Sequence, residues 1–338
     1  MHKETYELKK IAEDFIVKEN STEKIQKELK EKGEYKVFRL RKKHYTTENA
    51  VQQIAKALRL PRKNIGYAGS KDSKAITTQL ISIRAAPKEN ILALHLNDLE
   101  LEYLGAMEDP ICLGDLEGNS FEITIRNLSE SKEDAPRKIT MFINYFGEQR
   151  FSKNNAAIGK AIIKKEFKRA TELIIESSAD DAKKLEEHLS KSRNDYVGAL
   201  KTLPFKTLTL FIHAYQSKLW NEAAKALIEG NPGRENELIP LIGFGTEFMS
   251  KETEETYKQI LEKEGVSQSD FVIRAIPDLT SNGSDHTLYA EIKNLKIQEM
   301  EEDELNPGRN KCKVTFSLAK GCYATEAIKA MMVQDAPQ

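Results

Sequence analysis

The chain has 338 residues, of which 31% are charged and 39% hydrophobic, and 52 basic against 53 acidic side chains leave a formal net charge of -1. This composition is typical of a soluble globular protein with about two domains of roughly 150 residues each. The sequence contains no apolar run of about 18 residues, and its first residues lack an apolar segment, so we expect neither a membrane span nor a secretory signal.

Cysteine and histidine usage argues against disulfides and metals. The three cysteines form no CxxC pair, which suits a reducing, cytoplasmic environment. The six histidines are scattered, without HExxH or another metal-ligand spacing. We therefore expect no zinc centre and no other metal.

The first part of the chain predicts alternating helical and extended segments. Residues 21–34 are polar and charged and indicate a surface helix or loop. Residues 35–41 have the composition of a strand. Residues 46–60 carry apolar side chains at helical spacing, with a helix-start signal at Thr46 and a stop at Pro61.

Later segments predict further strands. A turn at 66–69 (GYAG) precedes a strand at 77–84. Residues 120–126 alternate between apolar and polar side chains, and the pattern recurs near 314–318. We therefore expect 120–126 to be a half-buried strand with one polar face, made of Glu122, Thr124 and Arg126.

Helical texture dominates roughly 153–230. The segment 207–229 predicts a long amphipathic helix that ends at Gly230, followed by a turn at 231–233. Loops are expected at 278–285 and 306–308. Strands at both ends with helices between them suggest that the last strand returns to the first sheet, with the middle of the chain as an insertion.

The near-neutral net charge conceals basic stretches. Between residues 36 and 74, eleven Lys or Arg stand against Glu48 and Asp72, and between 150 and 169 seven stand against Glu166. Such stretches can form a positive face for phosphates, although charge runs are more often plain solvated surface.

The segment that most plainly combines residues suited to catalysis is 66–79, GYAGSKDSKAITTQ. Its glycines allow a tight turn or a close approach to a ligand, and the lysines around Asp72 should keep the carboxylate ionised, as a nucleophile or a base requires. The segment lacks the P-loop pattern, and GYAG matches only the weak GXXG of KH domains. On chemistry alone, a surface turn in which Asp72 caps a helix is the simpler interpretation.

The same segment resembles the signature of the TruD family of tRNA pseudouridine synthases, G-x-K-D-x-x-A-x-T-x-Q, whose aspartate is catalytic. Three further segments resemble family motifs, in the family's order. Residues 14–19 (DFIVKE) match D-F-x-V-x-E. Residues 144–151 (NYFGEQRF) match the family's N-Y-F-G-x-Q-R-F-G, except that Ser152 stands for the last glycine. Residues 320–325 (KGCYAT) are similar to P-x-G-S-[FY]-A-T, with Cys322 for Ser. The resemblance extends from residue 14 to 330.

This resemblance implies an α+β fold with the pseudouridine-synthase catalytic domain, a mixed and mostly antiparallel sheet flanked by helices, and an inserted α/β domain. On this basis we expect a discontinuous catalytic domain at 1–165 and 300–338 and the insertion at 166–299. The implied reaction detaches uracil and rejoins it through carbon without redox change, so no cofactor is expected.

The resemblance also implies that Asp72 acts at the ribose, either by attacking C1′ or by removing the 2′ proton. Lys71 or Arg150 is expected to pair with Asp72 and hold it ionised. The basic stretches are then interpreted as contacts with the tRNA backbone.

Four more residues receive roles by the same resemblance. Phe146 would stack on the target base, while Phe15, Asn144 and Tyr323 would line the uridine pocket. A base removed from its stack needs a flat partner and a polar reader of its edge. For the aromatic side chains of residues 144–151, packing in a core is the alternative interpretation.

The implied substrate is uridine 13 in the D-arm of tRNA. A noncatalytic RNA-binding protein, such as a tRNA chaperone of the same fold, is the main alternative, and the intact motif around Asp72 argues against it. A methyltransferase is disfavoured because no glycine-rich nucleotide-binding turn follows a strand.

Overall fold

The computed structural model describes residues 6–131, 134–230 and 237–333, and the chain divides into two compact units. The first unit comprises Met1–Phe142 and Glu291–Gln338, and the second comprises Ile143–Ala290. The chain crosses from one unit to the other in β7 (Met141–Ile143) and β10 (Tyr289–Glu291), which are hydrogen-bonded to each other.

These limits differ from the domain boundaries expected at 165/166 and 299/300. Helix α4 (Asn155–Ile163) belongs to the second unit because it packs along the central helix there, α8 (Phe205–Gly230). Strand β11 (Lys293–Ile297) belongs to the first unit because it pairs with β13 (Asn310–Ala319).

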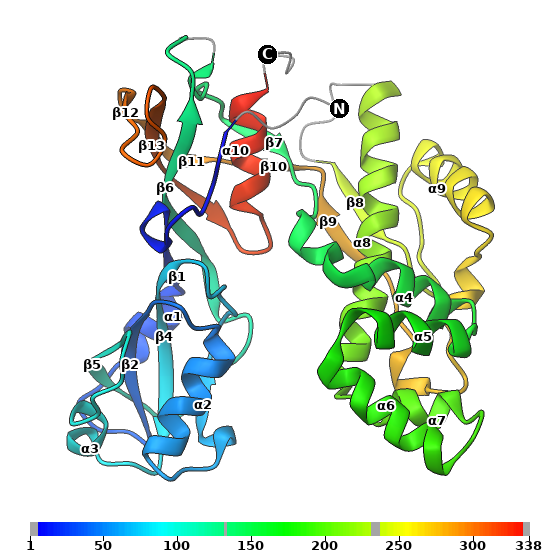
Figure 1. The fold of residues 1–338 in the computed structure, drawn as a ribbon, viewed down its shortest axis with the longest axis horizontal. Helices are drawn as coiled ribbons and strands as arrows, with labels where there is room; N and C mark the ends of the chain where they lie inside the picture. Colours follow the sequence, from blue (N-terminus) through cyan, green and yellow to red (C-terminus); the bar gives the residue numbers. More distant parts are fainter. Residues whose placement is uncertain (1–5, 132–133, 231–236, 334–338) are drawn as a thin grey trace. The chain divides into compact units, whose positions relative to one another are not determined.

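A mixed sheet organises the first unit (Figure 1). Within its described residues, nine strands form one sheet in the order β11-β13-β6-β1-β4-β2-β5, with β12 paired to β13 and β3 to β4. Strands β1 and β4 are parallel, whereas β6, β2 and β13 pair antiparallel with their neighbours. The predicted fold class is confirmed. The other strands are β1 (Phe15–Ser21), β2 (Tyr35–Lys42), β3 (Ile65–Tyr67), β4 (Ile76–Arg84), β5 (Leu99–Met107), β6 (Leu116–Leu128) and β12 (Glu301–Glu302).

Helix α2 (Thr47–Ala57) covers one face of this sheet beside β2 and β4, as Figure 1 shows. The predicted start is confirmed, since the Thr46 hydroxyl accepts a hydrogen bond from the Asn49 amide at 3.1 Å. The apolar stripe of α2, including Ile54, packs against Phe38 and Ile81. The remaining helices of the unit are η1 (Ala12–Asp14), α1 (Glu23–Glu28), η2 (Arg62–Asn64), α3 (Lys88–Leu92) and α10 (Ala324–Met332).

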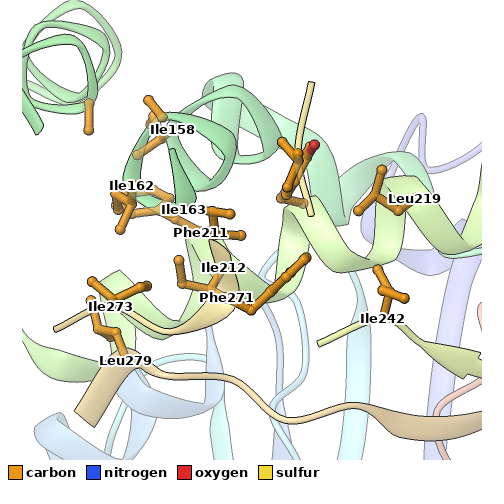
Figure 2. Close-up of a cluster of buried hydrophobic side chains, with 14 of the residues drawn as sticks. Ile158, Ile162, Ile163, Phe211, Ile212, Leu219, Ile242, Phe271, Ile273 and Leu279 are labelled. Carbon is orange, nitrogen blue, oxygen red and sulfur yellow. The ribbon is translucent and has the colours of Figure 1, made fainter. Parts of the chain in front are cut away.

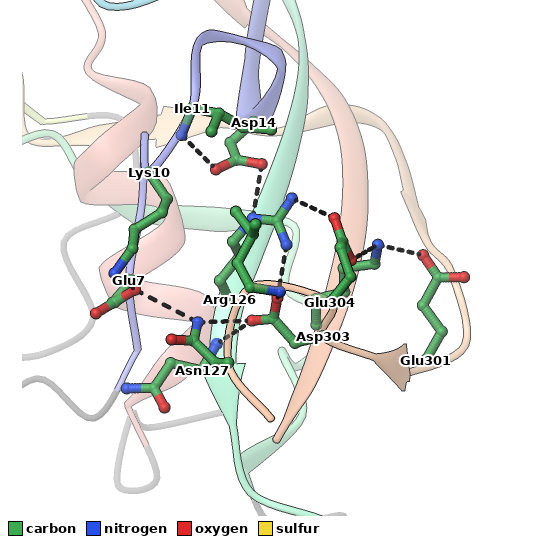
Figure 3. Close-up of polar contacts among 12 residues, drawn as sticks. Glu7, Lys10, Ile11, Asp14, Arg126, Asn127, Glu301, Asp303 and Glu304 are labelled. Carbon is green, nitrogen blue, oxygen red and sulfur yellow. Dashed lines mark hydrogen bonds and ion pairs between the residues drawn. The ribbon is translucent and has the colours of Figure 1, made fainter. Parts of the chain in front are cut away.

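The polar face expected for residues 120–126 is largely buried, which corrects the half-buried prediction. Thr124 and Arg126 of β6 are both buried. The Arg126 guanidinium binds Asp14 at 2.8 Å, Asp303 at 2.6 Å and Glu304 at 3.0 Å, as Figure 3 shows. The charge can be buried because carboxylates from two other segments of the chain surround it.

The second unit is built around α8, whose buried side chains meet those of α4 and of the segment 271–279 (Figure 2). Trp220 lies fully inside this core, and its indole N–H donates to the Ile239 carbonyl at 3.0 Å. The predicted 207–229 helix is confirmed. The other elements are η4 (Glu148–Asn154), α5 (Phe167–Ser177), α6 (Ala179–Lys191), α7 (Tyr196–Lys201), β8 (Leu238–Leu241), α9 (Lys251–Glu264), η5 (Gln268–Phe271), η6 (Pro277–Leu279) and β9 (Ser284–Thr287).

The turn expected at 231–233 lies outside the described residues. The loop expected at 278–285 contains the end of η6 and the start of β9. In the part of the chain that the structure describes, no helix is both long and apolar enough to cross a membrane.

Candidate active site

Asp72 lies on the loop that joins β3 to β4 in the first unit, in a stretch without helix or strand from residue 68 to 75. Its side chain is 54% exposed, so the carboxylate is open to a solute. The expected alternative of a helix cap does not hold, because β4 follows the loop.

Buried side chains hold the backbone of this loop. The Lys71 amide donates to the Thr47 hydroxyl at 2.8 Å, and that hydroxyl donates to the Gln79 side-chain carbonyl, also at 2.8 Å. The Gln79 amide in turn donates to the Gly69 carbonyl at 2.8 Å. Because Thr47 and Gln79 are almost completely buried, the helix α2 and the strand β4 fix the loop that carries Asp72.

Both glycines of GYAG lie where an added Cβ would come close to neighbouring atoms. A Cβ on Gly66 would lie 2.3 Å from the Ile111 carbonyl oxygen, which belongs to the neighbouring backbone. A Cβ on Gly69 would lie 2.9 Å from the Lys71 ammonium and 3.2 Å from the Glu19 carboxylate. The first glycine therefore serves packing, and the second makes room for a buried ion pair.

That ion pair accounts for Lys71. Its ammonium lies 2.5 Å from the Glu19 carboxylate, and both side chains are buried. Burial raises the pKa of Glu19, and the attraction of Lys71 opposes the rise without cancelling it. Lys71 is therefore bound to Glu19, and the expectation that it pairs with Asp72 is corrected.

Asp72 forms an ion pair with Lys9, a residue that the sequence analysis missed. The Lys9 ammonium lies 3.2 Å from the Asp72 carboxylate and 4.2 Å from the centre of the Phe15 ring. It therefore links the candidate catalytic group to a second candidate residue. No local signal distinguishes Lys9, because 63 positions of sequence separate it from Asp72.

Phe15 and Tyr323 lie at different depths in the first unit. Phe15 begins β1 and is 6% exposed, with its ring edge-on to Phe121 at a centroid distance of 6.2 Å. Tyr323 precedes α10 and is partly exposed, and its carbonyl accepts hydrogen bonds from the amides of Glu326 and Ala327 in that helix. Phe15 thus packs against Phe121 with little of its ring exposed, whereas Tyr323 is open to solvent in part.

In the second unit, Asn144 and Phe146 lie beside His286. The Asn144 amide donates to the Thr287 hydroxyl at 3.2 Å, and His286 contacts the Asn144 carbonyl at 2.9 Å. The side-chain oxygen of Asn144 is buried and has no hydrogen-bond partner among the described residues. An unsatisfied buried acceptor costs about 1–3 kcal/mol, so a ligand that donates to it would be favoured.

The ring of Phe146 packs against aromatic neighbours. It stacks on His286 at a centroid distance of 4.4 Å and meets Trp220 edge-on at 5.5 Å. Burial lowers the pKa of His286, and its hydrogen bond with the Asn144 carbonyl opposes the shift. The packing interpretation of Phe146 is therefore observed. Its neighbours Trp220 and His286 come from segments distant in sequence, in α8 and β9 respectively.

Phe146 and Arg150 also line a pocket of about 400 Å³ within the second unit. The Arg150 guanidinium lies 5.9 Å from the centre of the Phe146 ring, and its Nε donates to the Ser217 hydroxyl at 3.2 Å. Other lining side chains include His213 and Gln216. The pocket offers a flat ring, a cation and amide groups together, which suits a planar polar ligand.

The basic stretch 36–74 is not a uniform positive face. Lys42 is buried, and the structure pairs Arg39, Arg41, Lys43 and Arg62 with carboxylates. The side chains that stay exposed and make no ion pair with a described residue are Lys56, Arg59, Lys63 and Lys74. For Lys42, the interpretation of the stretch 36–74 as contacts with the tRNA backbone is therefore wrong.

Comparison with known proteins places the chain among the tRNA pseudouridine synthases. The model of the family "tRNA pseudouridine synthase D (TruD)" matches residues 5–188, 176–238 and 231–331. The chain belongs to this family, which confirms the resemblance drawn from its motifs.

Individual relatives agree over nearly full length. "Probable tRNA pseudouridine synthase D" of Methanosarcina mazei is 30% identical over 96% of this chain and 93% of that protein. The tRNA pseudouridine synthase D of Aquifex aeolicus is 28% identical over 97% and 98%, respectively. The crystal structure of the "Putative tRNA pseudouridine synthase D (TruD)" from Methanosarcina mazei has a TM-score of 0.71 at 28% identity, covering 96% of this chain and 93% of that one.

Proposed function

We propose that this chain isomerises uridine to pseudouridine at position 13 in the D-arm of tRNA, with Asp72 as the catalytic residue. The observation that carries the proposal is the exposed Asp72 carboxylate on a loop held by buried hydrogen bonds, paired with Lys9. A rigid loop that presents a charged carboxylate suits attack on C1′ or removal of the 2′ proton. Since its substrate is tRNA, we place the protein in the cytoplasm.

The proposed reaction needs only groups that the chain and the RNA supply. The bond between N1 of uracil and C1′ breaks, the base turns, and a bond from C5 to C1′ forms, while the proton on C5 is lost and N1 gains one. The route through the 2′ proton removes the hydrogen on C2′, the carbon that carries the 2′-OH in RNA. No redox partner or energy source enters this balance, so we propose that no cofactor takes part.

Substrate recognition is proposed for both units. The unpaired Asn144 oxygen could accept a hydrogen bond from N3–H of uracil, and Phe146 offers a flat ring beside it. In the first unit, Phe15 and Tyr323 are proposed as uridine contacts by family resemblance. In the second unit, Arg150 is proposed to hold a phosphate or the base. The buried Lys71 is proposed to act through Glu19 and the loop.

The direct test uses purified protein and an unmodified tRNA transcript, without added metal or cofactor. Pseudouridine is mapped by carbodiimide labelling and primer extension. A single new stop at the D-arm uridine, absent when that uridine is replaced by cytidine, is expected. Tight tRNA binding without any new stop would instead favour a noncatalytic RNA-binding protein.

Phe146→Ala is expected to lower kcat by about 10- to 100-fold, because stacking on a base contributes about 1–3 kcal/mol. The Kd for tRNA should change less than about threefold, since one stacked base is a small part of a phosphate-dominated interface. Phe146→Leu is the control, because it keeps most of the apolar contact with Trp220 but lacks a flat face. If the loss of activity in each variant is proportional to its loss of Tm, Phe146 serves packing only.

Lys74→Gln is expected to weaken tRNA binding and to reduce the slope of log Kd against log salt by about 1, as loss of one phosphate contact requires. Lys74 is exposed on the loop that carries Asp72. Lys32→Gln is the matched control. Lys32 is also exposed, but it comes before the first residue of β2, Tyr35, whereas the last residue of β2, Lys42, is the one that contacts the Asp72 loop. Equal slopes in both variants would show that Lys74 is ordinary solvated surface.

A further inference from the structure

Lys42 is a buried ammonium that the proposed mechanism does not use. Its side chain is 1% exposed, at the last residue of β2. Its Nζ donates to three backbone carbonyls, those of Tyr45 at 2.5 Å, Asp72 at 3.0 Å and Lys71 at 3.3 Å. These three bonds use all the donors that a lysine ammonium has.

The strand register explains why this lysine points inward. Side chains two residues apart share one face of a strand, so Lys42 continues the buried row of Phe38 and Leu40. Lys42 pairs with Thr77, at the start of β4 and just beyond the loop that carries Asp72. An inward side chain at this register therefore reaches the loop backbone instead of solvent.

Burying this charge is costly. Lys42 makes no ion pair with a described residue, and only carbonyl oxygens receive its hydrogen bonds. Burial lowers the pKa of Lys42 to about 8. The nearby Lys71 ammonium also lowers this pKa, whereas the Asp72 carboxylate opposes the shift. A buried charge of this kind often stabilises a fold less than an apolar side chain of the same size.

We propose that Lys42 is a positioning residue for the isomerisation, whose ammonium clamps the carbonyls of Lys71 and Asp72 and so fixes the direction of the Asp72 side chain. The inference rests on the proposed role of Asp72. The Lys71 and Asp72 carbonyls lie on either side of the Asp72 Cα, so two hydrogen bonds from one ammonium restrict the rotation of that residue's backbone. Thr47 and Gln79 hold the loop before Asp72, and Lys42 holds Asp72 itself.

The test compares Lys42→Met with Ile83→Ala. Methionine matches the length of lysine but donates no hydrogen bond. Ile83 is fully buried in the same sheet, roughly 23 Å along β4 from the loop. Lys42→Met is expected to lower kcat by about 100-fold, as misplacement of a reacting group by about 1 Å does, with KM within about threefold. Its Tm should fall no further than that of Ile83→Ala, which should keep its kcat.

Amide hydrogen exchange provides a readout that does not depend on turnover. In Lys42→Met, exchange in residues 70–74 should accelerate by about tenfold or more, while β5 keeps its wild-type rates. In Ile83→Ala, the exchange rates of residues 70–74 should not rise relative to those of β5. Unchanged loop exchange in Lys42→Met would overturn the inference, whatever the activity.

The outcomes separate this inference from the proposed function. An enzyme that requires Asp72 but tolerates Lys42→Met with an unchanged kcat would overturn only the role of Lys42. A protein that forms pseudouridine without Asp72, or forms none, would overturn the proposed function. In the latter case, the exchange rates alone decide whether Lys42 holds the loop.

Discussion

Asp72→Asn is expected to bind tRNA with the affinity of the unchanged protein and to form no detectable pseudouridine, a loss on the order of 10⁴-fold or more. The amide has the size of the carboxylate but is neither a nucleophile nor a base at neutral pH. The loop should keep its conformation, because its hydrogen bonds to Thr47, Gln79 and Lys42 involve backbone groups. The lost ion pair with Lys9 is partly exposed and contributes little to stability.

Three measurements on the same preparation decide this prediction. Carbodiimide mapping reports product, filter binding reports the Kd for tRNA, and thermal denaturation reports folding. Asp180→Asn, an exposed change at the start of α6 in the second unit, is the matched control and should behave as the unchanged protein. Turnover by Asp72→Asn within about tenfold of normal would remove Asp72 from the central role.

Arg126→Met is expected to lower the free energy of unfolding by about 3–5 kcal/mol, the largest stability effect that we predict. The change leaves Asp14 and Asp303 buried without the guanidinium that neutralises them. Urea denaturation measures the effect. Lys313→Met is the control, because it breaks a partly exposed pair with Glu122 of β6, the strand that also carries Arg126, and should cost less than about 1 kcal/mol.

The pH dependence of Arg126→Met provides an independent check. Burial alone would raise the pKa of Asp303, but hydrogen bonds from Asn306, the Asn127 and Leu305 amides and Arg126 outweigh burial and lower it to about 2. The stabilisation by this depressed pKa is present above the unfolded value near 3.8 and is lost as the pH falls towards 2. The difference in stability between the two proteins should therefore shrink between about pH 5 and pH 2. A constant difference would mean that the lost packing of Arg126 dominates.

Local features of the fold were predictable from sequence because their causes are local. Helical spacing of apolar residues and a capping threonine predicted α2, and alternation predicted β6 and β13. The burial of β6 was not predictable in the same way. Arg126 reads as a polar-face residue in its own strand, and only carboxylates from distant segments allow its charge to be buried.

The motif around Asp72 likewise identified the family and the candidate catalytic carboxylate from sequence alone, because both depend on residue types at fixed spacing. Which charges meet was decided only by the tertiary structure. Lys71, adjacent to Asp72, turns to Glu19, while Lys9 reaches Asp72 and Lys42 turns inward to the loop backbone. The reason is physical: strand register and burial determine where a long charged side chain can find a partner, and neither follows from its neighbours in sequence.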